Sequence, residues 1–184
     1  HAALMEDAMW RERGSFTPVE PGLHGPGLPF RITPQGGSGR PIAQPPPVAA
    51  RPLAGVRVVA FTMGWAGPLA SRHLADLGAD VVKIESEAYP DWWRGWEKAA
   101  VSDPPAHEIK LPFMAVNRNK RGIALDLRDP QGLAQARKLV RGADVVIDNY
   151  AAGTLEKLGL GVAELHALRP GLISIAMSAF GATG

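Results

Sequence analysis

From residue 52 onward, short apolar runs alternate with stretches in which apolar residues recur at helical spacing. The apolar runs predict strands over residues 56–61, 81–84, 121–127, 145–148 and 172–177. The helical spacing predicts helices over residues 69–77 and 130–141, and helical turns over 155–158 and 162–168. Alternation of strands and helices is typical of βα units. The pattern therefore predicts an α/β fold with a Rossmann-like, mainly parallel sheet flanked by helices.

Residues that favour helix ends mark the limits of the two longer helices. Asp129 is placed as the N-cap of the later helix, and Pro130 suits its first position because no N–H is needed there. Pro68 is placed in the same way at the first position of the earlier helix, and Gly78 ends that helix. Within the later helix, an apolar stripe is expected to face the core: Leu133, Ala136 and Val140.

Residues 86–112 interrupt this alternation. The segment contains Trp92, Trp93 and Trp96, and no helical pattern follows the second strand directly. Loops of this length without secondary structure are uncommon and are usually functional. We therefore expect an irregular insertion whose order depends on a partner.

Residues 1–50 differ from the rest of the chain in composition. Ten of the 17 prolines lie in residues 1–52, and the proline- and glycine-rich stretch 33–50 predicts a linker that is partly polyproline II. Upstream of it, residues 2–11 predict a short helix and residues 16–30 predict extended segments, too little to bury a core. The sequence thus divides into an irregular Pro/Gly-rich segment, 1–50, and the α/β part, 51–184.

Composition excludes several classes of protein. Lys and Arg number 20 against 18 for Asp and Glu, which is not the basic surface that nucleic-acid binding requires. The absence of cysteine excludes disulfides and fits a reducing compartment, so a cytoplasmic location is expected. No run of 18 apolar residues or signal-peptide pattern occurs, so no membrane partner is expected. The five histidines lack ligand spacing, so no metal is expected.

The turn after the first strand, residues 62–68, lies where a Rossmann-like fold receives its ligand. Together with Glu85 at the end of the second strand, this turn is reminiscent of an NAD site, but the glycine fingerprint G-x-G-x-x-G is missing. A tight turn with a solvated glutamate is the simpler interpretation.

Polar residues also flank the third and fourth strands. Asn117, Asn119 and Lys120 come before the third strand, Arg121 begins it, and Arg128 follows it. Donors at both ends could hold phosphates, although such side chains are normally just solvated. Asn149 and Tyr150 follow the fourth strand, where a ligand role and a turn residue with a packed aromatic are equally good interpretations. No acid/base pair or nucleophile is readable from spacing, so these patterns predict a ligand-binding half without visible catalytic groups.

Several motifs follow one another in the order of a known family. They are PLAGVRVV at 52–59, LGADVVKIE at 77–85, NRNKRGIALDL at 117–127, DVVIDNY at 144–150 and SAFG at 178–181. Together they resemble the family III coenzyme A (CoA) transferases of the CaiB/BaiF type. The resemblance covers about residues 52–184.

The resemblance implies that ten residues contact CoA: Trp65, Ala66, Leu125, Asp126, Leu127, Arg128, Asn149, Tyr150, Ala151 and Lys157. Residues 125–128 correspond to the family's adenine and phosphate contacts, and residues 149–151 to its pantetheine side. Lys157 corresponds to a basic phosphate contact, and residues 65–66 to the loop near the thioester. Trp65 stands where formyl-CoA transferases of the family carry glutamine, and Ser86 where they carry arginine, which disfavours formyl and oxalyl substrates.

The same resemblance implies an activity for a longer parent protein. That protein is expected to transfer CoA from an acyl-CoA donor to a carboxylic acid acceptor through an aspartyl-CoA intermediate. The family's aspartate nucleophile lies beyond Gly184, so no catalytic residue is assigned here and this chain alone is expected to be inactive. Two alternatives remain: an acyl-CoA racemase or isomerase of the same family, and a non-catalytic CoA-binding module.

Residues 26–31, PGLPFR, are similar to the tail by which many members of the family end. A tail that precedes a head suggests that this chain crosses the junction of two fused transferase modules. Because family members form interlocked dimers, we expect either a homodimer or a pseudo-dimer of tandem modules.

Overall fold

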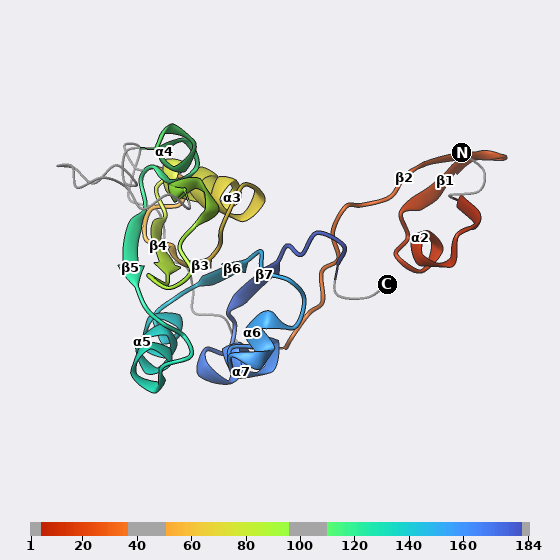
Figure 1. Cartoon of the computed structure of the whole chain (residues 1–184). Coiled ribbons are helices and arrows are strands. Elements are labelled where there is room, and N and C mark those ends of the chain that lie inside the picture. Colours follow the sequence, from red (N-terminus) through yellow and green to blue (C-terminus); the bar gives the residue numbers. More distant parts are fainter. Residues whose placement is uncertain (1–4, 37–50, 96–109, 182–184) are drawn as a thin grey trace. The chain divides into compact units, whose positions relative to one another are not determined.

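The computed structural model describes residues 5–36, 51–95 and 110–181. By its internal contacts, the chain separates into two compact units, His1–Gln35 and Gly36–Thr183 (Figure 1). Each unit is described by itself. Most of the predicted linker, together with Trp96, lies outside the described residues.

The first unit contains one short helix and one hairpin. Helix α2 (Ala8–Glu12) begins at Asp7, whose side chain accepts a hydrogen bond from the backbone N–H of Met9 at 2.9 Å. Strands β1 (Phe16–Glu20) and β2 (Leu23–Pro26) pair in antiparallel fashion. None of residues 5–36 is buried. The expected short helix and extended segments are confirmed, and so is the absence of a core among these residues.

The second unit is built on a five-stranded sheet in the order β5-β4-β3-β6-β7. Every neighbouring pair is parallel, which confirms the predicted sheet (Figure 1). The strands are β3 (Arg57–Phe61), β4 (Asp80–Glu85), β5 (Arg121–Ala124), β6 (Val145–Asp148) and β7 (Ile173–Ala176). Strand β5 ends three residues earlier than the sequence predicts, because the chain turns away after Ala124.

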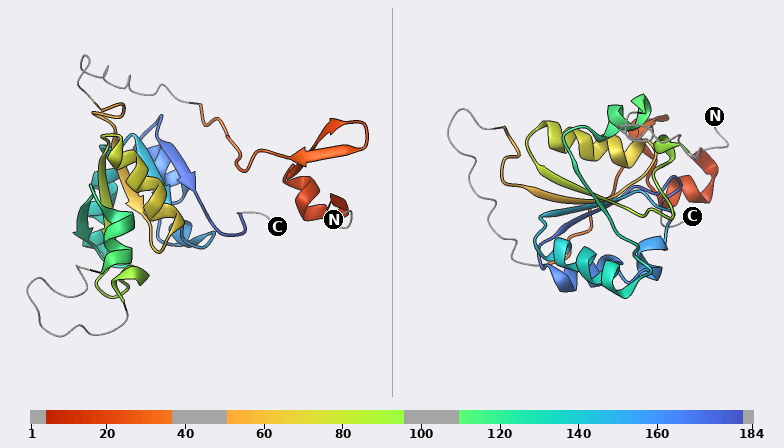
Figure 2. Two further views of the ribbon diagram at one scale, coloured as in Figure 1. Left: turned by 90° about the horizontal axis from the view of Figure 1, so that it is seen from above. Right: turned by 60° about the vertical axis from the view of Figure 1, so that its left-hand side comes forward.

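Helices cover both faces of this sheet (Figure 2). The central strand β3 alternates its side chains between two cores: Val58 and Ala60 lie on the side of helix α3 (Ala66–Asp76), while Val59 and Phe61 lie on the other side. That second core is closed by α5 (Pro130–Arg141), α6 (Thr154–Lys157) and α7 (Val162–Leu168). Because β3 is buried on both faces, its sequence is a continuous apolar run.

The helix ends follow the predicted capping residues with one exception. The Asp129 carboxylate accepts from the N–H of Gly132 at 2.9 Å, which confirms it as the N-cap of α5. Gly78 adopts φ +105° and ends α3, as predicted. Helix α3 begins two residues before Pro68, which therefore lies in the first turn; a proline is tolerated there because the first four N–H groups have no partner within the helix.

Helix α4 (Leu111–Asn117) was not predicted, since the irregular insertion was expected to run to residue 112. Phe113, Val116 and Asn117 are its buried residues, at the spacing of one helical face, and Pro112 lies in its first turn. This spacing is the signal that could have revealed the helix. The insertion also contains a 3-10 turn, η1 (Trp92–Arg94), which begins at Asp91. Among the described residues, no helix is long and apolar enough to cross a membrane.

Candidate functional site

A cavity of about 590 Å³ lies at the carboxyl end of the sheet. Its walls come from the ends of four strands and the segments that follow them: Met63 after β3, 125–128 after β5, 149–151 after β6, and, from β4 and its loop, Ile84, Glu85, Ser86, Ala88 and Tyr89. Trp92, Thr154 and Leu158 complete the lining. Small-molecule sites usually measure 300–1,000 Å³ and lie at this edge of open α/β sheets. The cavity therefore has the size and the place of a ligand site.

Seven of the ten residues that the sequence assigned to CoA line this cavity: Leu125, Asp126, Leu127, Arg128, Asn149, Tyr150 and Ala151. The other three do not. Trp65 and Ala66 are the N-cap and the first residue of α3 and are exposed, and Lys157 is exposed at the end of α6. The seven residues come from two segments about 25 positions apart, which the parallel order of the strands brings to one edge.

Arg128 forms an ion pair with Asp126 within the turn after β5. Its Nε and Nη2 donate to the two carboxylate oxygens at 3.1 and 2.9 Å. These hydrogen bonds lower the pKa of Asp126. The Arg128 side chain is 70% exposed, so its guanidinium faces solvent at the rim of the cavity. A planar guanidinium in this position can exchange a carboxylate for a phosphate without moving the backbone.

Glu85 also lines the cavity, and its charge is already paired. Arg94 donates to its two oxygens at 2.9 Å each, and the N–H of Asp91 donates at 3.1 Å. Burial acts to raise the pKa of Glu85, but the bonds from Arg94 and the charge of Lys83 outweigh it, so the net pKa is below the usual value. The carboxylate is therefore ionised and engaged by protein donors, which does not support the NAD alternative.

A buried ion pair connects three segments behind the cavity. Lys83 and Asp91 are 2% and 1% exposed, and Lys83 Nζ lies 2.9 Å from Asp91 Oδ2. Lys83 also donates to the carbonyl of Thr62, while Asp91 Oδ1 accepts from the N–H groups of Gly64 and Trp93 at 3.2 and 3.0 Å. Sequence reasoning missed this pair. The signal was a lysine inside the apolar run of β4.

Tyr150 serves both interpretations that the sequence left open. Its ring packs against the core beneath the sheet and also lines the cavity. Burial raises the pKa of Tyr150, and the charge of Asp148 adds to the shift, so the phenol is neutral at physiological pH. Asn149 also lines the cavity, and its amide is hydrogen bonded to the backbone of Met63.

The donors that precede β5 have protein partners, so the hypothesis that they hold phosphates is not supported. The amide of Asn117 donates to the carbonyl of Phe113. The amide of Asn119 donates to Asp76 at 2.6 Å. Arg121 donates to both oxygens of Asp80, and Lys120 donates to three protein oxygens. Arg128 differs because it follows the strand and lies at the cavity.

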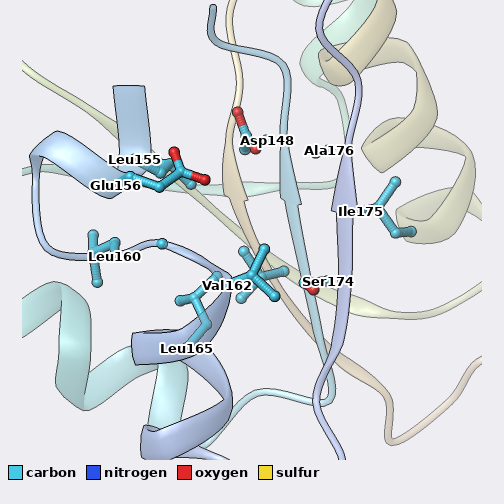
Figure 3. A pocket seen from close by; sticks show the side chains of 11 residues that line it. Asp148, Leu155, Glu156, Leu160, Val162, Leu165, Ser174, Ile175 and Ala176 are labelled. Atoms are coloured by element: carbon cyan, nitrogen blue, oxygen red, sulfur yellow. The ribbon is translucent and has the colours of Figure 1, made fainter. Parts of the chain in front are cut away.

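A second cavity, of about 70 Å³, lies between strands β6 and β7 and helices α6 and α7 (Figure 3). Asp148 and Glu156 lie at one end of it, and Val162 and Leu165 at the other. Its volume suits only one or two water molecules. In the described part of the chain, no group of three or more His, Asp or Glu side chains could hold a metal ion.

Comparisons with known proteins agree with this fold. A family model described as CoA-transferase family III matches residues 53–184. The chain therefore belongs to the CoA-transferase family III, the CaiB/BaiF family.

Two curated relatives show how far the similarity extends. The succinyl-CoA–D-citramalate CoA-transferase of Chloroflexus aurantiacus is 44% identical over 142 residues, which are 77% of this chain and 33% of the relative. The succinate–glutarate CoA-transferase of Agrobacterium fabrum is 42% identical over 134 residues, 72% of this chain and 34% of the relative. The chain thus spans about a third of the length of these relatives.

Solved structures give the same result. A CAIB/BAIF family protein from Brucella suis superimposes with a TM-score of 0.60 at 40% identity, covering 69% of this chain and 33% of that one. A hypothetical protein from Mycobacterium tuberculosis superimposes with a TM-score of 0.64 at 37% identity, covering 73% and 35%.

Proposed function

We propose that the full-length protein transfers CoA from an acyl-CoA donor to a carboxylic acid acceptor, and that this chain supplies part of its CoA site. The two curated relatives carry names that describe such a transfer, with succinyl-CoA or succinate on one side and D-citramalate or glutarate on the other. The proposed nucleophile is an aspartate beyond Gly184. Acyl-CoA and the acceptor acid are thus the partners of the enzyme, and CoA is its carrier.

The single observation that carries the proposal is the cavity at the carboxyl end of the sheet. Apolar side chains form much of its wall, among them Leu125, Leu127 and Leu158, which suits a purine and a pantetheine arm. Arg128 at the rim suits a phosphate, for which it would leave Asp126. The neutral phenol of Tyr150 suits an amide or a hydroxyl of the ligand.

Three further residues, Trp65, Ala66 and Lys157, are proposed to contact CoA from outside the cavity. Lys157 is exposed one turn beyond Thr154, which does line the cavity, so its flexible ammonium can approach a phosphate as a point charge. Trp65 and Ala66 begin α3 next to Met63 and would contact the thioester end of a ligand that extends past this wall.

In the proposed reaction, a carboxylate oxygen attacks the thioester carbonyl carbon and the C–S bond breaks, giving an anhydride and CoA thiolate. The thiolate attacks the aspartyl carbonyl of the anhydride, which releases the donor acid and leaves an aspartyl-CoA thioester. The acceptor carboxylate then reverses both steps. Because a C–S bond is broken twice and formed twice, CoA must be held by its nucleotide and pantetheine throughout, which is the task proposed for this cavity.

The test is to incubate the full-length protein with succinyl-CoA and, separately, glutarate, citramalate and monocarboxylic acids, and to follow acyl-CoA products by mass spectrometry. The expected result is a new acyl-CoA with at least one acid and an equivalent release of succinate. CoA binding without transfer to any acid would contradict the proposal and leave a non-catalytic module. Epimerisation of a 2-methylacyl-CoA without transfer would replace the transferase by a racemase.

A further inference from the structure

The side-chain amide of Asn149 is hydrogen bonded at both ends to one residue, Met63. Its Oδ1 accepts from the Met63 N–H and its Nδ2 donates to the Met63 carbonyl, each at 2.9 Å. Asn149 follows β6 and Met63 follows β3, and these two strands pair in the sheet. The side chain thus continues the pairing of β3 and β6 beyond the last pair of the two strands, Phe61 and Asp148.

Gly67 leaves the space in which this amide lies. A Cβ atom at position 67 would stand 2.6 Å from Asn149 Oδ1 and 2.8 Å from Thr62 Cγ2. Gly67 is buried in the first turn of α3 and does not line the cavity. A side chain at position 67 therefore has to displace the amide of Asn149, without reaching a ligand itself.

The loop that contains Met63 is held from its other side as well. Lys83 donates to the carbonyl of Thr62, and Asp91 accepts from the N–H of Gly64 at 3.2 Å. Four consecutive polar groups of the 62–64 backbone are thus bound by side chains from β4, η1 and the end of β6. Because each of these backbone groups would lose a hydrogen bond if the loop moved, the bonds hold the loop in one conformation.

This loop determines one wall of the large cavity. Met63 lines the cavity directly. The ring of Trp92, which also lines it, lies against Gly64, since a Cβ at that glycine would be 2.9 Å from Trp92 Cε3. A shift of residues 62–64 would therefore move both side chains of this wall.

We propose that Asn149 is a positioning residue for CoA binding: its amide fixes the Met63 loop and does not itself bind the ligand. The inference rests on the proposed function, because it takes the cavity to hold CoA. It reassigns a residue that the family resemblance placed among the ligand contacts. One lone pair of Oδ1 and one N–H of Nδ2 are engaged by Met63, so the orientation of the amide is set by the loop.

The test compares Asn149→Ala, Gly67→Ala and a matched control in the full-length protein. Both variants are expected to bind CoA about tenfold more weakly, because two hydrogen bonds that hold the wall are lost or displaced. The KM for acyl-CoA should rise by a similar factor while kcat changes little. In the ligand-free protein, hydrogen exchange of the Met63 N–H should accelerate in both variants.

Asn119→Gly is the control, since it removes an asparagine hydrogen bond to Asp76, away from the cavity, at a residue with φ +63° that glycine tolerates. It should leave CoA affinity unchanged. Wild-type CoA affinity in Asn149→Ala would overturn the inference. Weaker CoA binding in Asn149→Ala, with unchanged hydrogen exchange at Met63 and unchanged CoA affinity in Gly67→Ala, would also overturn it, because that result indicates direct contact of Asn149 with the ligand. If Asn149→Ala does not fold, Gly67→Ala carries the test. If the wild type does not bind CoA, the proposed function itself fails.

Discussion

The two ends of the parallel sheet carry similar polar residues and use them differently. Near the amino end, arginines pair with carboxylates of other elements: Arg121 of β5 with Asp80 of β4 at 2.6 Å, and Arg169 after α7 with Asp144 before β6 at 3.5 Å. At the carboxyl end, Arg128 pairs with Asp126, two residues earlier in the same turn. A pair between elements links two parts of the fold, whereas a pair within one turn links only residues of that turn.

This contrast explains why the carboxyl end is suited to a ligand. There, the inter-element pairs are largely buried: Lys83 with Asp91, and Arg94 with Glu85 of the cavity wall. The exposed arginine, Arg128, has a partner within its own turn, which a phosphate could replace. At the amino end, Arg121 and its partner lie on two neighbouring strands, β5 and β4.

Removing one partner of the buried pair is expected to cost the most stability. In Lys83→Met, Asp91 stays in the interior without its counter-charge, and the carbonyl of Thr62 loses its donor. Breaking a buried pair in this way costs about 3–5 kcal/mol. The free energy of unfolding of the full-length protein, measured by urea denaturation, should fall by this amount.

The matched change at the amino end is Arg121→Met. Its pair with Asp80 is exposed, with 69% and 44% of the two side chains accessible. Exposed pairs contribute about 0.5 kcal/mol or less, so this variant should unfold close to the wild type. Equal losses in the two variants would show that the buried and exposed pairs do not differ as described.

Lys120→Met is expected to have the next largest effect. The Lys120 ammonium donates to the carbonyls of Pro68 and Val116 at 2.7 and 2.9 Å, and to Asn117 Oδ1 at 2.9 Å, which joins α3 to α4. Leaving these acceptors without a donor should cost about 2–3 kcal/mol. Thermal unfolding at neutral pH measures the loss.

The pH dependence of the same variant gives a second readout. Burial, followed by the charge of Lys83, lowers the pKa of Lys120 from 10.5 to about 7. Between these values the unfolded chain binds more protons than the folded one, so this residue makes stability rise with pH. The wild type should therefore gain stability from pH 7 to 9 relative to Lys120→Met. If the stabilities of the two proteins changed in parallel with pH, the lowered pKa of Lys120 would be contradicted.

The smallest expected effect is a gain from Asp148→Asn. Burial raises the pKa of Asp148, and the charge of Glu156 raises it further, while Asp148 Oδ1 accepts from the N–H of Tyr150 at 2.9 Å. A carboxyl with a raised folded pKa contributes stability at low pH that is lost as pH rises through that pKa. Asparagine keeps the acceptor without the charge, so Tm should rise by about 1 °C at pH 7. The difference in Tm should vanish near pH 4. A difference that grows on acidification would show that the pKa of Asp148 is lowered in the folded protein and not raised.

The sequence reveals strands β3, β4 and β6 because they are largely buried in the parallel sheet and read as apolar runs, whereas the edge strands β5 and β7 are mostly exposed. Gly78 and Asp129 likewise act through local geometry, so their neighbours in sequence are enough to predict them. Helix α4 was missed because it is short and follows residues with no pattern of their own. Its buried positions, Phe113 and Val116, become meaningful only once α3 is there to cover them.

Residues of the site were harder to predict than the sheet. The lining residues at 125–128 and 149–151 could be named from motifs, since each follows a predicted strand. The hydrogen-bond partners of the lining residues could not be predicted. The contact of Glu85 with Arg94, nine residues later, depends on the course of the segment after β4, which has no sequence pattern. The contact of Asn149 with Met63, 86 residues away, depends on the order of strands in the sheet.

The central claim is that the cavity at the carboxyl end holds CoA, with Arg128 on a phosphate. Calorimetric titration of the full-length protein with CoA and with dephospho-CoA tests it most directly, on the wild type, Arg128→Ala, Lys157→Ala and, from the other end of the sheet, Arg121→Ala. Arg128→Ala should weaken CoA binding about tenfold at low salt, Lys157→Ala less, and both losses should shrink as salt rises. Arg121→Ala should bind as the wild type does. Unchanged CoA affinity in Arg128→Ala at low salt, or an equal loss in Arg121→Ala, would contradict the account.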